Sequence, residues 1–282
     1  MNTQRWHGAG LGLRRELIAL LANSIPPEVD FLEIAPENWI GIGGGKGHVL
    51  RELAEQVPIV AHGLCLNLGG FAPLDRELIA GVDALMRELR MPFYSEHLSY
   101  CADEGCLYDL MPIPFTSDAV GHVARRIRQV QDMLDQRIGV ENVSYYAAAP
   151  IDEMDEASFL RAVVQEADCL IHLDVNNVFV NSVNHGIDPY AYIASMPSQR
   201  IAYYHVAGHL RESESLVIDT HGADVIDSVW GLLEHAYMCH GVRPTLLERD
   251  FNFPPLGELL VEVGRIAQTQ DVTEGNAHAH AA

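Results

Sequence analysis

The stretch Ile171–Gly186, IHLDVNNVFVNSVNHG, decides the fold and the chemistry that we expect of this chain. It opens with a short apolar run, which is typical of a buried parallel strand. The run ends in Asp174; Asn176 and Asn177 follow, and then a polar loop leads to His185. An acid, amides and an imidazole are costly to gather at the end of a buried strand unless a cation offsets the cost. The stretch therefore predicts the beginning of a metal site.

Apolar strands alternate with amphipathic helices on both sides of this stretch. We expect strands at His7–Leu11, Phe31–Ile34, Ile59–His62, Phe93–His97, Ile138–Glu141, Leu170–Asp174, Ala202–Val206 and Thr245–Glu248. Helices are expected near Leu13–Ser24, Gly47–Gln56, Asp75–Leu89, Ser117–Leu134, Asp155–Ala167, Pro189–Met196, Ala223–His240 and Leu256–Ala267. Thr116 or Ser117 can cap one helix, and Asp188 with Pro189 can begin another. Eight strand–helix pairs predict a closed (β/α)8 TIM barrel, with a doubly wound open sheet as the main alternative.

Length and charge limit the classes of protein to consider. The 282 residues are 48% hydrophobic, which is enough for one large core, and nothing divides off a second domain. We expect a single catalytic domain over residues 1–268 and a disordered tail over residues 269–282. The formal net charge of -21 argues against electrostatic binding to nucleic acid or to an anionic membrane.

The sequence carries no pattern typical of a secreted, membrane-spanning or phosphate-loop protein. The five cysteines show no paired spacing, the amino terminus has no apolar signal core, and no stretch is long enough to span a bilayer. We therefore expect a cytoplasmic protein. Lys46 is the only lysine, so Schiff-base chemistry would have to use it, and the glycines around it do not match a phosphate-binding loop.

Acids, imidazoles and amides stand at the carboxyl ends of six successive predicted strands or in the loops that follow them. These residues are His62, Glu96, His97, Glu141, Asn142, Asp174, Asn177, His185, His205, His209, Asp219, His221, Glu248 and Asp250. In a parallel barrel all those ends meet at one rim, where catalytic groups of this fold lie. With so many carboxylates close together, several would have to bind protons unless metal cations lay between them. The number of ligands exceeds what one ion takes, so two or three metal ions are implied.

The kinds of ligand narrow the choice of metal. Imidazole and carboxylate without thiolate suit iron, manganese or zinc, and iron is compatible with oxygen chemistry. Alternate residues of a strand share a face, so His172 points the same way as Asp174 and is expected one layer deeper, as a partner behind the ligands. Glu96 and His97 cannot both point inward; we expect His97 to be the ligand and Glu96 to lie behind it or face a helix.

The ordered motifs resemble the DUF692 (UPF0276) family. The match runs through GAGLGLR (Gly8–Arg14), EIAPENW (Glu33–Trp39), AHG (Ala61–Gly63) and SEHLSY (Ser95–Tyr100). It continues through VENVSYY, HLDVNNVFVNSVNHG, HVAGH, DTHG and LLERD, over roughly residues 5 to 260. Characterised members of this family are multinuclear non-haem iron-dependent oxidative enzymes, among them the iron subunit of methanobactin biosynthesis.

The resemblance implies a TIM barrel with two or three iron ions, Fe2+ or Fe3+, at its rim; manganese or zinc remains an alternative. The implied ligands are His62, His97, Glu141, Asp174, Asn177, His185, His205, Asp219, His221 and Glu248, with Glu141 as a bridging carboxylate. Of these, Asp174, His221 and Glu248 are expected to be directly catalytic. The resemblance further implies use of O2 to modify residues, often cysteine, of a ribosomally made precursor peptide, with a small partner protein that binds the peptide leader.

Further residues flank the expected ligands. Asn142, His209, Arg249 and Asp250 are expected to contact the ligands or the substrate, with a purely structural role as the alternative. Glu37 and Asn38, after the second strand, are rim candidates whose alternative is a loop hydrogen-bond network.

Two other classes of function stay open on the sequence. A divalent-metal sugar isomerase or epimerase on the same barrel would use similar strand-end ligands but usually needs a catalytic lysine or acid pair. A related barrel endonuclease would need a basic face, which the net charge of -21 disfavours. The non-enzymatic alternative is a metal-binding or storage protein.

Overall fold

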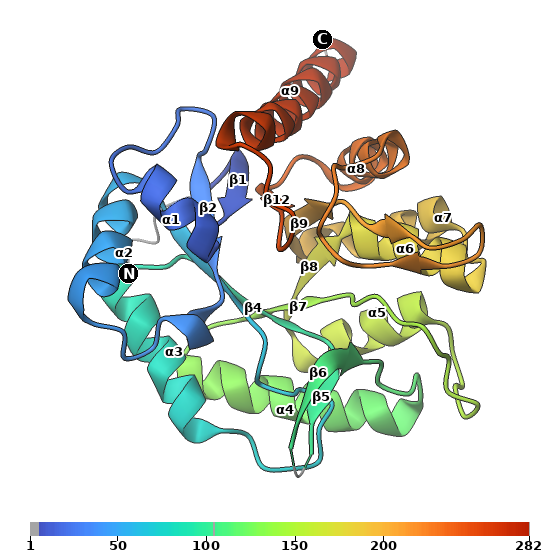
Figure 1. The fold of residues 1–282 in the computed structure, drawn as a ribbon. Helices are drawn as coiled ribbons and strands as arrows, with labels where there is room; N and C mark the ends of the chain where they lie inside the picture. Colours follow the sequence, from blue (N-terminus) through green and yellow to red (C-terminus); the bar gives the residue numbers. More distant parts are fainter. Residues whose placement is uncertain (1–5, 104, 282) are drawn as a thin grey trace.

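A computed structural model describes residues 6–103 and 105–281 of the chain. Eight parallel strands close into a barrel in the order β1-β12-β9-β8-β7-β4-β3-β2, and helices lie around its outside (Figure 1). The barrel strands are β1 (Ala9–Gly12), β2 (Phe31–Ile34), β3 (Ile59–Gly63), β4 (Tyr94–His97), β7 (Gly139–Glu141), β8 (Leu170–Asp174), β9 (Ile201–Ala207) and β12 (Thr245–Glu248). The predicted closed barrel is confirmed, and the open-sheet alternative is wrong.

The helices follow the strands as the apolar periodicity predicts. They are α1 (Arg15–Leu21), α2 (Gly44–Gln56), α3 (Arg76–Leu89), α4 (Ser117–Leu134), α5 (Glu156–Ala167), α6 (Val175–His185), α7 (Pro189–Ala194), α8 (Asp227–His240) and α9 (Leu256–Ala281), with 3-10 turns at Pro36–Asn38 and Ser198–Arg200. Thr116 caps α4 by accepting the backbone N–H of Ala119, and Asp188 caps α7. Both capping residues are those that the sequence predicts.

Helix α6 occupies the segment for which a polar loop is predicted. Its asparagines have low intrinsic helix propensity, but Asp174 caps its first turn by accepting the backbone N–H of Asn177 at 2.8 Å. Val178 and Phe179 on this helix are buried in the main core. Capping and core packing therefore outweigh propensity, and the loop prediction needs correction.

Helix α9 also differs from its predicted extent, because it continues through the segment predicted as a disordered tail as far as Ala281. The side chain of Gln270 donates hydrogen bonds to the backbone carbonyls of Gly8 and Arg243, both at 3.1 Å. These bonds tie the helix to the beginnings of β1 and β12, which explains why it does not end at Gln268. Beyond that anchor it projects past the barrel (Figure 1).

The two ends of the barrel differ in chemistry. At the amino-terminal ends of the strands, Trp6 packs on Phe31, Phe93 and Tyr203 with ring centroids 4.8–5.4 Å apart. This aromatic cluster fills that end of the barrel with apolar side chains. At the opposite end, two small hairpins follow β4 and β9: β5 (Tyr100–Ala102) with β6 (Cys106–Met111), and β10 (Leu210–Arg211) with β11 (Val217–Ile218). The polar side chains of the strand ends lie at the carboxyl-terminal rim of the barrel.

No helix in the described part of the chain combines the length and the apolar character needed to cross a membrane.

Candidate metal centre

Five strand ends bring acids and imidazoles together inside the carboxyl-terminal rim of the barrel. His62 is the last residue but one of β3, Glu141 ends β7, Asp174 ends β8, His205 lies in β9 and Glu248 ends β12. All five are buried, none more than 6% exposed. The register of neighbouring strands places Asp174 opposite His205, and Glu248 beside the end of β9. The convergence expected from the strand ends is therefore what the structure shows.

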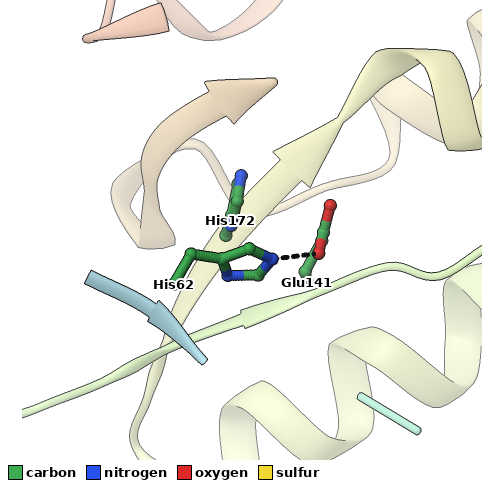
Figure 2. Close-up of side chains that lie close together, drawn as sticks. All are labelled: His62, Glu141 and His172. Carbon is green, nitrogen blue, oxygen red and sulfur yellow. Dashed lines mark ion pairs between the residues drawn. The ribbon is translucent and has the colours of Figure 1, made fainter. Parts of the chain in front are cut away.

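The first group of side chains gathers around Glu141. Its Oε2 lies 2.9 Å from Nε2 of His62 and 3.2 Å from Nε2 of His97, and the two imidazole nitrogens are 3.2 Å apart. His172, from β8, lies beside this group (Figure 2). Two rings and a carboxylate at these separations can share one metal ion.

The second group surrounds His205. Its Nδ1 lies 3.1 Å from Oε2 of Glu248, 3.8 Å from Oε1 of Glu141 and 4.0 Å from Oδ2 of Asp174. Glu141 belongs to the first group as well, so it stands between two possible ion positions. That is the arrangement expected of a bridging carboxylate.

The third group is built on His221, which follows the β10–β11 hairpin. Its Nε2 lies 2.8 Å from Oδ1 of Asp219, and its Nδ1 lies 3.4 Å from Oε2 of Glu248. His221, Asp174 and Glu248 each offer a ligand atom within 4.8 Å of the others. The backbone of His221 has a φ of 49°, which is uncommon for a residue other than glycine and marks a position held by its surroundings.

Several of these atoms are buried without a hydrogen bond of good geometry among the described residues. Asp174 Oδ2 and Asn177 Oδ1 make no hydrogen bond, and each such atom costs about 1–3 kcal/mol when it is left unpaired. Glu141 Oε2, His205 Nδ1 and His221 Nε2 each have a charged partner only 2.8–3.1 Å away but make no well-aligned hydrogen bond. All five belong to expected ligands, and their nitrogen and oxygen lone pairs are what a divalent or trivalent cation binds. The residues present thus fit a multinuclear metal centre.

Four of the histidines expected to be ligands, His62, His97, His205 and His221, each have a partner at the other ring nitrogen. Nδ1 of His62 lies 2.9 Å from the Ser95 hydroxyl, and Nδ1 of His97 lies 2.8 Å from the backbone carbonyl of Gly63. A Cβ atom on Gly63 would meet Oε2 of Glu96 at 2.3 Å, so a larger residue there would force the Glu96 side chain to move. Outer hydrogen bonds of this kind fix which nitrogen carries the proton and leave the other free for a metal.

Carboxylates hold the other two rings. Nε2 of His205 lies 2.9 Å from Oε2 of Glu33, which also accepts the hydroxyl of Tyr203 at 2.9 Å. Nδ1 of His221 lies 3.0 Å from Oδ2 of Asp250. Carboxylate–histidine pairs of this kind are common behind metal ions because they raise the basicity of the ligand ring.

The pKa values of the acids and imidazoles in these groups are shifted in different directions. Burial alone would raise the pKa of Glu141, but His62 and His97 outweigh it and lower that pKa. Burial raises the pKa of Asp174 well above its usual range, and the neighbouring Glu141 raises it further. Burial would lower the pKa of His97, yet Glu141 raises it to about 9. Without metal, these groups balance one another by sharing protons, which a bound cation would displace.

The surroundings of His172 favour its neutral form. Burial, aided by the nearby His205 and His62, lowers the pKa of His172 well below its usual range.

A cavity of about 510 Å³ opens over these groups. Its wall includes Arg14, Trp39, Leu64, Tyr146 and Phe251. Arg14 donates to Oε1 of Glu248 at 2.8 Å and to Oδ1 of Asp250, so a cation of the chain itself orients two acids of the rim. Sequence reasoning missed Arg14 as a site residue, although it ends the GAGLGLR motif.

The structure does not bring His185 to the other expected ligands. Its Nε2 lies 2.8 Å from the backbone carbonyl of Tyr145, and its ring stacks on that of Tyr145 at 4.0 Å. The reason is α6: a helix rises about 1.5 Å per residue, so its 11 residues carry His185 roughly 16 Å from Asp174. The inclusion of His185 among the ligands depended on the loop that α6 replaces.

The expected partners behind the ligands divide into two kinds. Asn142 exchanges hydrogen bonds with both backbone groups of Asp174, and its own carbonyl accepts Nδ2 of Asn177, so it fixes two expected ligands. His209 contacts Oδ1 of Asn176 at 2.7 Å, and Asn176 donates to Asp219 at 2.8 Å. These residues orient the site through short chains of hydrogen bonds.

The remaining flanking residues have mainly structural contacts. Glu96 accepts the hydroxyl of Tyr94 at 2.8 Å and stays outside the metal groups. Arg249 pairs with Asp224 and Glu262 on the helical side. Glu37 accepts the backbone N–H groups of Leu64 and Cys65, which is the loop network given as its alternative, whereas Asn38 lines the cavity.

Sequence reasoning also missed Glu33, Ser95 and Asn176 as contributors to the site. Glu33 and Ser95 stand in the EIAPENW and SEHLSY motifs, so the motifs contained them without showing their role. Only their partners in space, His205 and His62, reveal what they do.

Fold and side chains together define a (β/α)8-barrel protein whose rim can hold several metal ions in a nitrogen and oxygen environment. The chain belongs to the family of RiPP precursor modification enzymes MbnB/TglH/ChrH, whose model matches residues 8–271. Membership indicates that the protein is an enzyme, and the predicted family resemblance is confirmed.

Relatives agree with this assignment. The chain is 56% identical over 272 residues to a UPF0276 protein of Nitrosospira multiformis, covering 96% of each chain. It is 59% identical over 263 residues to a UPF0276 protein of Pseudomonas aeruginosa, covering 93% of this chain and 92% of that one.

Solved structures of other enzymes share the fold. The 3-keto-D-glucoside 4-epimerase of E. coli superposes with a TM-score of 0.62 at 14% identity, covering 93% of this chain and 99% of that one. Endonuclease IV of Thermus thermophilus superposes with a TM-score of 0.57 at 14% identity, covering 93% and 98%. At this identity the likeness concerns the barrel alone.

Proposed function

We propose that this protein is a multinuclear non-haem iron enzyme that uses O2 to modify residues, foremost cysteine, of a ribosomally made precursor peptide. The observation that carries the proposal is the set of buried nitrogen and oxygen atoms that lie close together without well-aligned hydrogen bonds on Glu141, Asp174, Asn177, His205 and His221. Membership of a family of RiPP precursor modification enzymes supports the peptide as substrate class.

The donor groups divide naturally among three ion positions. His62, His97 and Glu141 would hold one ion, and His205 with Glu141, Asp174 and Glu248 would hold a second. Asp174, Asn177, Asp219 and His221 would hold the third. Shared carboxylates would join the positions, so two or three irons could act together; manganese or zinc suits the same donors.

Bound iron would supply Lewis acidity toward a substrate thiol and electrons for the reduction of O2. The chain's own residues would prepare the site for that chemistry. Ser95, Gly63, Glu33 and Asp250 hold the four ligand rings in one orientation each. Arg14 fixes Glu248 and Asp250 without a water molecule in between.

The cavity suits the reactive part of a peptide rather than the whole of it. About 510 Å³ accommodates a few residues, with the apolar walls of Leu64, Tyr146 and Phe251 around an acidic floor. The rest of a precursor would lie outside the cavity. This division supports a small partner protein that binds the peptide leader while this chain receives the residue to be modified.

The sugar isomerase or epimerase alternative rests on the barrel alone. The only lysine, Lys46, lies exposed on α2 and does not line the cavity, so that alternative lacks its usual lysine base. The storage alternative would require a closed ligand shell, whereas an open cavity adjoins these donors.

The test is to purify the protein without oxygen, count its metals by elemental analysis, and measure O2 consumption with a cysteine-containing peptide. The proposal expects two or three irons per chain, O2 uptake only when the peptide is present, and a mass change of the peptide. Zinc alone with no response to air would refute it and favour the hydrolytic or isomerase class. Iron without O2 uptake on any thiol peptide would favour storage.

A further inference from the structure

Two aromatic side chains on the wall of the metal-centre cavity are largely exposed. Tyr146, in the loop after β7, is 50% exposed, and Phe251, in the loop after β12, is 63% exposed. Both line the cavity of about 510 Å³ that opens over the expected metal ligands. A single exposed apolar side chain is common on protein surfaces, so exposure alone carries no argument. What sets these two rings apart is how firmly the chain holds them there.

Hydrogen bonds hold Phe251 in place on either side. The backbone N–H of Asp250 donates to the carbonyl of His221 at 2.9 Å, and Nδ2 of Asn252 donates to the carbonyl of Gly222 at 3.1 Å. A Cβ atom on Gly222 would lie 3.3 Å from Cβ of Phe251. The loop after β12 is therefore fastened to the loop that carries His221, and Phe251 lies at the centre of that contact.

The backbone next to Phe251 has an uncommon conformation. Asn252 has a φ of 49°, in the left-handed region that residues other than glycine seldom adopt. Such conformations persist where the surrounding structure imposes them, and they cluster at binding and catalytic sites. Here the turn at Asn252 directs its side chain to Gly222 and leaves the neighbouring phenylalanine exposed over the cavity.

Tyr146 is fixed to the other end of the same loop. Its hydroxyl accepts the backbone N–H of Asp219 at 3.0 Å, so the ring cannot turn away without losing that bond. The two rings therefore flank the segment from Asp219 to Gly222, one at each end, and both face the cavity. Aromatic side chains held in one position offer a large apolar surface and lose little conformational freedom when a ligand binds.

We propose that Tyr146 and Phe251 form a binding site for an uncharged apolar side chain of the substrate peptide, next to the residue that is modified. The site is continuous with the metal centre, because both rings and the expected ligands line one cavity. The metal centre would bind the reacting group, and the two rings would select its neighbour in the peptide. Both are thus specificity-determining residues. The inference rests on the proposed function for the nature of the occupant, a peptide.

The first experiment compares two short synthetic peptides with a central cysteine between serines and glycines. In one peptide both neighbours of the cysteine are leucine, and in the other both are glycine, so either side of the cysteine can supply the apolar side chain. Calorimetric titration of zinc-loaded protein without oxygen gives the two Kd values. We expect the leucine peptide to bind about tenfold more tightly, as for the partial burial of one leucine side chain.

Variants then assign the preference to the two rings. Phe251→Ala should bring the two Kd values within about twofold of each other by weakening the leucine peptide only, and Tyr146→Ala should reduce the preference. Phe251→Leu keeps an apolar side chain and should keep most of the preference. Ile151→Ala is the matched control, because Ile151 is 65% exposed in the same loop as Tyr146 but does not line the cavity. It should leave the preference unchanged.

Metal content separates recognition of the peptide from support of the loop. By elemental analysis, Phe251→Ala protein should hold as many ions as the unchanged protein. Loss of an ion would mean that Phe251 only holds the loop of His221, and would overturn the inference. Equal Kd values of the two peptides for the unchanged protein, or a preference that survives in Phe251→Ala, would overturn this inference alone. Failure of both peptides to bind would overturn the peptide as substrate class, and the inference with it.

Discussion

Replacing Glu33 by glutamine tests how far a residue behind the ligands controls the metal centre. Oε2 of Glu33 accepts Nε2–H of His205 and the hydroxyl of Tyr203, both at 2.9 Å, and all three residues are at most 1% exposed. Glutamine keeps the shape but loses the charge, and its amide can turn a donor toward His205. The ring would then no longer be held with its Nδ1 lone pair toward Glu141, Asp174 and Glu248.

The size of the effect follows from the kind of contact. Partners behind a metal ligand change metal affinity by about 10–100-fold when they are replaced, which corresponds to roughly 1.4–2.7 kcal/mol. The loss should concern the ion that His205 holds, because His62 and His97 have partners of their own. Glu33→Gln protein should therefore keep about one ion tightly and release another at lower chelator concentration.

The assay is a chelator titration followed by elemental analysis, with Glu156→Gln as the matched control. Glu156 is likewise a buried carboxylate that accepts a tyrosine hydroxyl, that of Tyr192 at 3.0 Å, but it contacts no histidine of the centre. Equal metal release from the two variants would show that the effect comes from loosening the core. Unchanged metal affinity in Glu33→Gln would refute the reasoning about His205.

The other predictions concern Glu156, which contacts no histidine of the metal centre, and two residues of the β8–α6 segment, Asp174 and His185. Burial raises the pKa of Glu156 to about 8, so between about pH 4.5 and pH 8 the native state binds a proton that the unfolded state has lost, and stability falls as the pH rises by up to roughly 1.4 kcal/mol per unit. Urea midpoints measured from pH 5 to pH 8 should show a smaller decline for Glu156→Gln, and parallel declines would contradict this. Asp174→Ala should lose at least one iron per chain and the O2 uptake with peptide, by elemental analysis and an oxygen electrode; full iron content with full activity would remove Asp174 from the centre. His185→Gln should leave the iron count unchanged because the ring contacts Tyr145, and a lost ion would restore it as a ligand.

The facing rule for strands worked because it is a property of the backbone. Alternate side chains of a strand share a face, so it followed from spacing alone that His172 shares the face of Asp174 and that Glu96 and His97 do not both point inward. The structure shows His97 against Glu141 and Glu96 against Tyr94. Beyond the strand ends this rule gives no guidance, and there the prediction for His185 depended on whether α6 was a helix or a loop.

Helix α6 shows how tertiary contacts can decide the secondary structure of a short segment. Asparagine-rich VNNVFVNSVNH has weak helix propensity, and the sequence offered no strong reason to end the strand and start a helix at Asp174. Asn142 binds both backbone groups of Asp174 from β7's end, and the buried face of α6 joins the main core. A residue 32 positions away thus helps to set the helix start.

The sequence by itself determined the eight-stranded barrel and the chemical character of its rim. Apolar runs of strand length, separated by helical periodicity, predict a closed barrel, and that arrangement carries the strand-end acids and imidazoles to the same rim. Both features depend on patterns within short stretches of chain.

Only the tertiary structure decided which atom of each side chain faces the centre and which residue holds it there. Glu33 lies 172 positions from His205, and Arg14 lies 234 positions from Glu248, so no local sequence pattern predicts either contact. The physical reason is that a hydrogen bond depends on distance and angle in space, whereas a sequence motif records only neighbours along the chain.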